Sequence, residues 1–206
     1  FGQNRYISFQ DGFATKQNQQ TLPTRSVVTN KAVSVEMSYQ FFGAFVADAK
    51  VKETQYQFLH MEGMHKMALV GAPALPAKNE IVAVPKGAKP VVKIIRADYK
   101  DYGGFYIHPA LEPARDTEGA PAPEFEIDEA IYSTNAFFPS QIVEVVNVGV
   151  NRGTGLAFTE IRPVQFNPVT KTIRVYKNIE SEITFAGRAK PFGNETSANT
   201  SHFTNL

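Results

Sequence analysis

Apolar and polar residues alternate with a period of two along most of the chain. Val33, Val35 and Met37, for example, are separated by single polar residues. An alternation of this kind is typical of a strand with one buried face. Comparable segments bounded by Gly, Pro and Asn predict about ten short strands. They cover residues 33–38, 45–51, 55–60, 81–84, 91–95, 105–108, 141–150, 156–161, 164–166, 172–176 and 179–185.

Turn signals arrange the C-terminal half into hairpins. Asn151-Arg152-Gly153 predicts a tight turn. Pro168 predicts a second hairpin loop, because its fixed φ suits a turn and it cannot donate to a ladder. No segment of ten residues has a convincing helical period, and the best candidate is the short acidic segment 124–132. We therefore expect an all-β domain, an antiparallel β-sandwich in preference to a barrel.

One segment, from residue 109 to residue 123, interrupts this pattern. It holds four prolines and one glycine in fifteen residues, which excludes a strand or a helix. A loop of this length in a compact domain is uncommon and is usually functional or disordered. It could link two subdomains, but we expect its ends to return to one sheet system. The expected organisation is a polar arm over residues 1–30, either mobile or forming a weak edge strand, then regular structure from about Ala32 and a single sandwich domain over residues 31–206.

Composition narrows the possible functions. The formal net charge is +1, whereas nucleic-acid-binding domains are usually strongly basic. No apolar stretch is long enough for a membrane span, and the absence of cysteine excludes a cysteine nucleophile within this chain. His60 and His65 do not share a face with a carboxylate partner, and no phosphate-binding loop is present. We expect no catalytic residue, metal or cofactor, and neither nucleic acid nor membrane as a partner.

Arg115 is the candidate functional residue of the proline-rich loop. No other Lys or Arg lies between Lys100 and Arg152. Arg115 could be a solvated charge paired with Asp116 or Glu112, which would contribute well under about 1 kcal/mol. Alternatively, a long cation presented on a stiff, extended loop is what the pocket of a basic-specific protease would bind.

A second group of residues leaves a different function open. Tyr99, Tyr102, Phe105 and Tyr106 are dense enough to form an aromatic platform, as in a secreted adhesion or carbohydrate-binding β-sandwich. The same residues could equally be the core and rim of a strand. The sequence immediately downstream would separate this alternative from a protease-binding domain.

Several segments resemble the propeptides of the gingipain family of cysteine peptidases. Residues 70–76 and 81–92, together with residues 178–185, are similar to the lysine-specific form, and residues 163–176 resemble the arginine-specific form. Phe137-Phe138-Pro139 also resembles the arginine-specific form, and the most specific part is the run Asn167-Pro168-Val169-Thr170-Lys171-Thr172 with its flanking strands. The similarity runs from about residue 33 to the C-terminus, which is most of the chain.

The resemblance implies a β-sandwich prodomain without catalysis of its own. Such prodomains assist the folding of a caspase-like peptidase and keep it latent in the periplasm of Bacteroidetes until it is secreted or reaches the cell surface. The implied partner is the cognate catalytic domain, bound in cis and, after cleavage, in trans. A basic residue of the loop enters the specificity pocket in this family, and the matching residue here is Arg115, flanked by Pro113, Ala114 and Asp116. The resemblance also implies that the chain stops before the activation cleavage site.

Overall fold

The chain folds almost entirely into strands. The structure is a computed structural model that describes residues 5–10, 12–14, 25–31, 33–113 and 123–186, with the backbone alone for residues 12–14, 25 and 186. The described residues form strands β1 (Arg5–Ser8), β2 (Gly12–Ala14), β3 (Arg25–Asn30), β4 (Ser34–Gln40), β5 (Gly43–Val51), β6 (Thr54–His60), β7 (His65–Lys66), β8 (Pro76–Val84), β9 (Lys89–Gly103), β10 (Val143–Asn151), β11 (Thr154–Ile161), β12 (Val164–Asn167) and β13 (Thr172–Ala186), with one helix, α1 (Glu129–Tyr132).

Three antiparallel sheets make up the described fold. The first has the order β2-β1-β5-β6, and the second has the order β10-β11-β8-β7. The third follows the order β12-β13-β4-β3, and β9 pairs with β13 along its whole length. The expectation of an antiparallel all-β fold is therefore confirmed.

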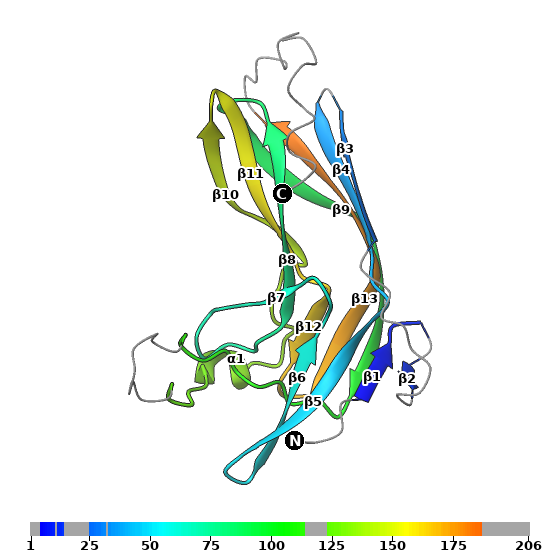
Figure 1. Cartoon of the computed structure of the whole chain (residues 1–206), viewed down its shortest axis with the longest axis vertical. Coiled ribbons are helices and arrows are strands. Elements are labelled where there is room, and N and C mark those ends of the chain that lie inside the picture. Colours follow the sequence, from blue (N-terminus) through cyan, green and yellow to red (C-terminus); the bar gives the residue numbers. More distant parts are fainter. Residues whose placement is uncertain (1–4, 11, 15–24, 32, 114–122, 187–206) are drawn as a thin grey trace.

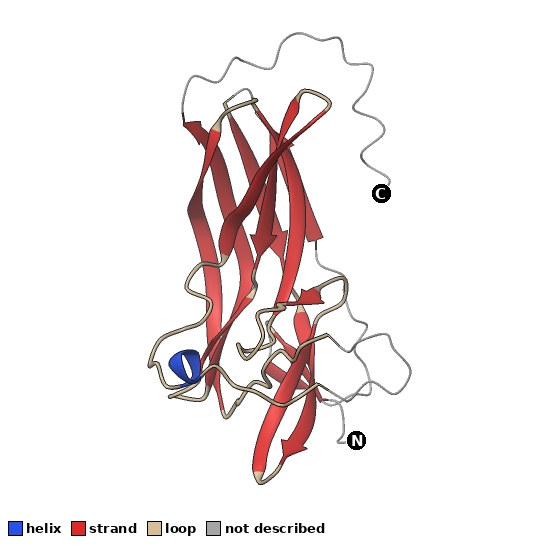
Figure 2. Cartoon of the chain, turned by 90° about the vertical axis from the view of Figure 1, so that its left-hand side faces the viewer, coloured by secondary structure: helices blue, strands red, loops and turns tan. Residues whose placement is uncertain are grey.

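Two of these sheets face one another in the upper half of the molecule. Figure 1 shows β8, β10 and β11 in one layer and β3, β4, β9 and β13 in the other. The lower half contains β1, β5 and β6 with α1 beside them, and Figure 2 shows that most strands run along the long axis. Across the described ranges, no helical segment reaches the length and apolarity that a membrane span requires.

The two predicted hairpins are confirmed. Arg152 and Gly153 connect β10 to β11 with φ values of 47° and 87°, which is the geometry of a two-residue turn with both central residues left-handed. Pro168 lies in the turn between β12 and β13, and the Asn167 side chain accepts hydrogen bonds from the Val169 and Thr170 backbone N–H groups. The side chain therefore closes the turn that proline begins.

The C-terminal strands are longer than the sequence predicted. Residues 172–176 and 179–185 belong to one strand, β13. The pairing of β13 with β9 shifts register twice, so the strand continues although the alternation of apolar and polar residues is interrupted. Residues 105–108, predicted as a strand, form only an isolated bridge between Ile107 and Gln57. Of the best helix candidate, residues 124–132, only Glu129–Tyr132 form a helical turn, which Asp128 caps by accepting a hydrogen bond from the Ile131 N–H.

The expectation that regular structure begins near Ala32 is wrong. Strand β1 pairs with β5, so that Tyr6 lies opposite Phe45. Ile7 and Phe9 have no exposed surface, and they anchor this polar segment to the core. The Gln, Asn and Thr residues that make up much of residues 1–30 concealed this strand, although Tyr6, Ile7 and Phe9 are all buried. The division into an arm and one domain stays a prediction.

The core follows the inward faces of the sheets. The alternating pattern predicts twelve core residues; six of them are buried, five are half-buried, and one, Ile94, is 38% exposed beside a register shift between β9 and β13. The six buried residues are Val35, Val82, Phe166, Ile173, Val175 and Ile183. The half-buried residues are Phe45, Phe58, Val92, Val145 and Phe185.

Replacing Phe166 by alanine should lower the free energy of unfolding by about 3 to 5 kcal/mol. The side chain is fully buried, and its ring contacts those of Tyr106 and Tyr132. Chemical denaturation followed by fluorescence measures the change. Val169→Ala is the matched control in the adjacent turn, where the side chain is 50% exposed, and it should change stability by less than about 0.5 kcal/mol. Equal effects of the two substitutions would contradict this assignment of the core.

Candidate functional site

The described part of the proline-rich loop consists of its two ends. Arg115, Ala114 and Asp116 lie outside the described residues, and Pro113 is the exposed last residue before them. The loop begins later than the sequence predicted, because Pro109 and Ala110 are buried and bridged to residues 70–73. The candidate site is therefore the base of this loop, which determines where the loop leaves the body of the domain.

The segment that enters the loop is held on both sides by backbone hydrogen bonds. On one side, the Gln57 N–H donates to the Tyr106 carbonyl and the His108 N–H donates to the Gln57 carbonyl, both at 2.9 Å. On the other side, the Ala74 N–H donates to the His108 carbonyl at 3.0 Å, and the Ala110 N–H donates to the Ala72 carbonyl at 2.8 Å. The entry segment thus lies between β6 and residues 71–74.

The segment that leaves the loop is fixed by α1 and by aromatic contacts. The Tyr132 hydroxyl donates to the Ile107 carbonyl at 2.6 Å, which ties the helix to the entry segment. Phe125 lies 5.3 Å, centroid to centroid, from each of the rings of Tyr56 and His108. The exit segment therefore packs on the same side chains that flank the entry segment.

Gly71 joins the two ends of the loop. Its N–H donates to the Ala110 carbonyl and its carbonyl accepts from the Asp128 N–H, each at 2.9 Å. Its φ is +79°, and a Cβ atom would lie 2.9 Å from the Asp128 nitrogen. Only glycine adopts this conformation without strain while leaving room for the neighbouring backbone. One residue thus holds the entry and exit of the loop at one place.

His108 is buried at this base. Its ring lies 4.3 Å from that of Phe58, and its Nδ1 is 2.7 Å from the Pro109 carbonyl oxygen. A carbonyl oxygen only accepts, so Nδ1 carries the hydrogen in the neutral ring. Burial lowers the pKa of His108 below its usual value and nearby Lys66 lowers it further, although the hydrogen bond to Pro109 raises it. The neutral imidazole is the form that fits the folded domain.

The aromatic residues considered as a binding platform do not lie on one open face. Phe105 is buried, Tyr102 and Tyr106 are half-buried, and the Tyr106 ring packs against Tyr56 at 5.0 Å. Tyr99 is exposed, but the Arg174 guanidinium lies 4.0 Å from its ring centroid. These positions favour the core-and-rim interpretation over the platform.

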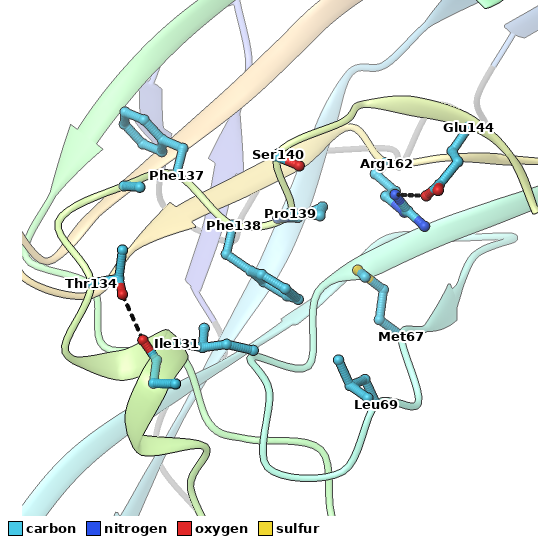
Figure 3. A pocket seen from close by; sticks show the side chains of 12 residues that line it. Met67, Leu69, Ile131, Thr134, Phe137, Phe138, Pro139, Ser140, Glu144 and Arg162 are labelled. Carbon is cyan, nitrogen blue, oxygen red and sulfur yellow. Dashed lines mark hydrogen bonds and ion pairs between the residues drawn. The ribbon is translucent and has the colours of Figure 1, made fainter. Parts of the chain in front are cut away.

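A hollow of about 480 Å³ lies beside α1. Figure 3 shows Met67, Leu69, Ile131 and Phe138 directed towards it, with Arg162 and its ion-pair partner on one side. Sequence analysis missed this site because its walls come from distant segments of ordinary apolar composition. Among the described residues, no group of three or more His, Asp or Glu side chains is arranged to hold a metal ion.

Comparison with known proteins identifies the family. The Propeptide_C25 family matches residues 16–204, which is nearly the whole chain. The chain belongs to this family. As a propeptide, it is the non-catalytic part of a peptidase zymogen.

Curated relatives of the propeptide are gingipains of Porphyromonas gingivalis. Lys-gingipain HG66 is 28% identical over 173 residues, which cover 80% of this chain and 10% of the relative. Gingipain R1 is 27% identical over 109 residues, which cover 53% of this chain and 11% of the relative. The propeptide thus spans about a tenth of the length of the curated relatives it matches.

Two solved structures resemble the propeptide. One, described as structural insight into the zymogenic latency of gingipain K from Porphyromonas gingivalis, has a TM-score of 0.67 and 25% identity, and the match covers 90% of this chain and 100% of that one. The other is a complex of Porphyromonas gingivalis RgpB pro- and mature domains, with a TM-score of 0.69 and 18% identity over 81% of this chain and 84% of that one. The second likeness concerns the fold alone.

Gly71→Ala should destabilise the loop base more than the same substitution in an open turn. Alanine at φ +79° is strained, and its Cβ would contact the Asp128 backbone. We expect a loss of about 2 to 4 kcal/mol and faster hydrogen exchange at the Asp128 N–H. Gly87→Ala is the matched control, because Gly87 has φ +77° and an added Cβ would have nothing within 4 Å. Similar losses and unchanged exchange at Asp128 would show that the Gly71 contacts are unimportant.

Stability should fall as the pH is lowered from about 7 to 5, in part through His108. Its folded-state pKa lies below the value of about 6.5 expected in the unfolded chain. Below pH 6.5 the unfolded chain therefore binds a proton that the folded domain takes up only at lower pH, and this contribution to stability is lost. Thermal melting of His108→Gln across this range should show a shallower pH dependence than the wild type. His60→Gln, at an exposed position, is the control for replacing a histidine, and an equal change in both variants would contradict the role of His108.

Proposed function

We propose that this chain is the latency domain of a gingipain-type cysteine peptidase, and that Arg115 occupies the specificity pocket of the catalytic domain. Its partner is that catalytic domain, bound in cis before activation and in trans afterwards. The observation that carries the proposal is the pair of hydrogen bonds made by Gly71, which fixes both ends of the loop. Family membership and the described latency of the gingipain K relative support the same function.

The chemistry of arginine suits this role. A guanidinium group presents a planar set of donors that matches a carboxylate with two parallel hydrogen bonds. A pocket that selects basic side chains offers such an acid in a desolvated environment. Because Arg115 is the sole Lys or Arg between Lys100 and Arg152, the loop offers this pocket a single candidate.

The anchored base lowers the entropic cost of binding. A loop whose two ends are fixed at one place has fewer conformations to lose than a free segment, and its prolines restrict it further. Covalent attachment in the zymogen raises the effective concentration of the loop to about the millimolar range. The loop resists cleavage as long as its scissile carbonyl stays out of near-attack geometry relative to the nucleophile.

The same domain would act during export and folding. A prodomain that binds the catalytic domain before activation stabilises its folded state by mass action. We place the zymogen in the periplasm and the active peptidase outside the cell or on its surface. In this proposal the propeptide contributes binding surface and a blocking side chain, and the peptidase contributes all of the catalytic chemistry.

Arg115→Ala should weaken inhibition of the cognate catalytic domain by the 206-residue chain added in trans. Truncating one partner of a buried, hydrogen-bonded charge pair typically removes about 2 to 5 kcal/mol. The inhibition constant should therefore rise roughly thirty-fold to several thousand-fold. Arg115→Lys keeps the charge but loses the planar donor set, and it should lie in between for an Arg-selective enzyme.

Two further variants act as controls for this measurement. Asp116→Ala should have little effect, because a carboxylate at the rim of an interface contributes little. Arg152→Ala, in the β10–β11 turn, should inhibit like the wild type. Wild-type inhibition by Arg115→Ala would overturn the role of Arg115, and sensitivity of Arg152 instead would place the inhibitory element in that hairpin.

A further inference from the structure

The hollow beside α1 is continuous with the base of the loop. Leu69, in one wall, precedes Gly71 by two residues, which span at most ~7 Å. Ile131, in the opposite wall, follows Asp128 by three residues, or ~5 Å along a helix. Gly71 and Asp128 are themselves hydrogen-bonded to each other. Both walls are therefore extensions of the two segments that carry the loop.

A catalytic domain that binds the loop also comes close to the hollow beside α1. A stable protein interface buries about 800 Å² on each partner, which corresponds to a patch ~30 Å across. Leu69 and Ile131, in the two walls, lie two and three residues from Gly71 and Asp128, the residues that join the two ends of the loop. A patch of that size centred on the loop base includes the hollow.

The lining of the hollow, walls and floor together, is apolar and open to solvent. Figure 3 shows Leu69, Ile131 and Phe138 converging on the hollow. Leu69 is 57% exposed, which leaves a large apolar side chain uncovered next to the loop. The position of Phe138 is fixed by its backbone, which exchanges hydrogen bonds of 2.9 and 2.8 Å with the backbone of Phe166. A fixed apolar surface of this kind favours an apolar partner side chain.

The rim of the hollow carries an excess of negative charge. Arg162 is largely buried and binds two carboxylates, Glu144 at 2.7 Å and Glu160 at 2.6 Å. Its Nη1 also donates to the Gln141 carbonyl at 3.2 Å, and His65 Nε2 lies 3.4 Å from Glu160. The Glu144 side chain is 42% exposed, so the surplus charge faces solvent at the edge of the apolar lining. A cation beside the incoming apolar side chain would complement it.

We propose that this hollow is a second docking point for the peptidase catalytic domain, and that it receives an apolar side chain of leucine to phenylalanine size next to a basic residue. The proposal rests on the proposed latency function. In this proposal the contact has two parts. Arg115 blocks the specificity pocket, and the hollow orients the propeptide so that the loop is aligned with that pocket. Binding at the hollow contributes affinity without touching the catalytic residues.

Leu69→Glu tests the proposal in the inhibition assay with the 206-residue chain. A carboxylate in the apolar lining should raise the inhibition constant about tenfold or more, as expected when a central apolar contact is lost. Leu69→Ala should give a smaller increase. Glu144→Gln should slow association at low salt by about two- to five-fold and have less effect at high salt. Thermal melting should change little, because Leu69 is solvent-accessible and Arg162 keeps Glu160 and the Gln141 carbonyl as partners in Glu144→Gln.

Ile81→Glu is the matched control, because Ile81 is 59% exposed on β8, away from the loop base, and its replacement should leave inhibition within about twofold of the wild type. Combining Arg115→Ala with Leu69→Glu should multiply the two effects, since the sites are separate. Wild-type inhibition by the folded Leu69→Glu chain, while Arg115→Ala is impaired, would overturn the docking point and leave the latency function standing. A wild-type chain that neither binds nor inhibits the catalytic domain would overturn both.

Discussion

The pairing of β13 with β9 is the constraint on which the rest of the structure depends. It runs the full fifteen residues of both strands and leaves the other side of β13 to β12 and β4. Strand β12 is held against β13, and it carries the buried Phe166. The Phe166 backbone pairs with that of Phe138, and its ring contacts the rings of Tyr106 and Tyr132. Tyr132 in turn binds the Ile107 carbonyl. The sheet therefore determines, contact by contact, where the proline-rich loop is attached.

The base of the loop is held mainly by hydrogen bonds between backbone groups. Residues 71–74 lie beside the entry segment like an extra strand, and Gly71 also accepts from Asp128 on the exit segment. Backbone hydrogen bonds have little freedom of direction, so they fix the separation of the two ends more tightly than packing alone. The point at which the loop leaves the domain is therefore set by the backbone and not by the side chains of the loop.

Two kinds of surface meet at this end of the molecule. The loop carries one cation, Arg115, among prolines and small residues, whereas the hollow beside α1 is apolar with a surplus carboxylate. Charge recognition gives selectivity for a specific pocket, and an apolar contact adds affinity that does not depend on that pocket. A propeptide that uses both can remain bound while the loop itself avoids productive alignment for cleavage.

The sequence by itself determined the local features of this protein. Alternation in segments such as residues 33–38 and 172–176 predicted the strands, Arg152-Gly153 predicted a hairpin turn, and the runs around Pro139 and Pro168 resembled gingipain propeptides. Period-two patterns report which face of a strand is buried, but they carry no information on which strand lies beside it. The tertiary structure alone therefore decided that two apolar residues, Ile7 and Phe9, anchor a polar segment, and that residues 105–108 form no regular strand. It also decided that Gly71 meets both Ala110 and Asp128, because contacts between distant segments depend on how the whole sheet is assembled.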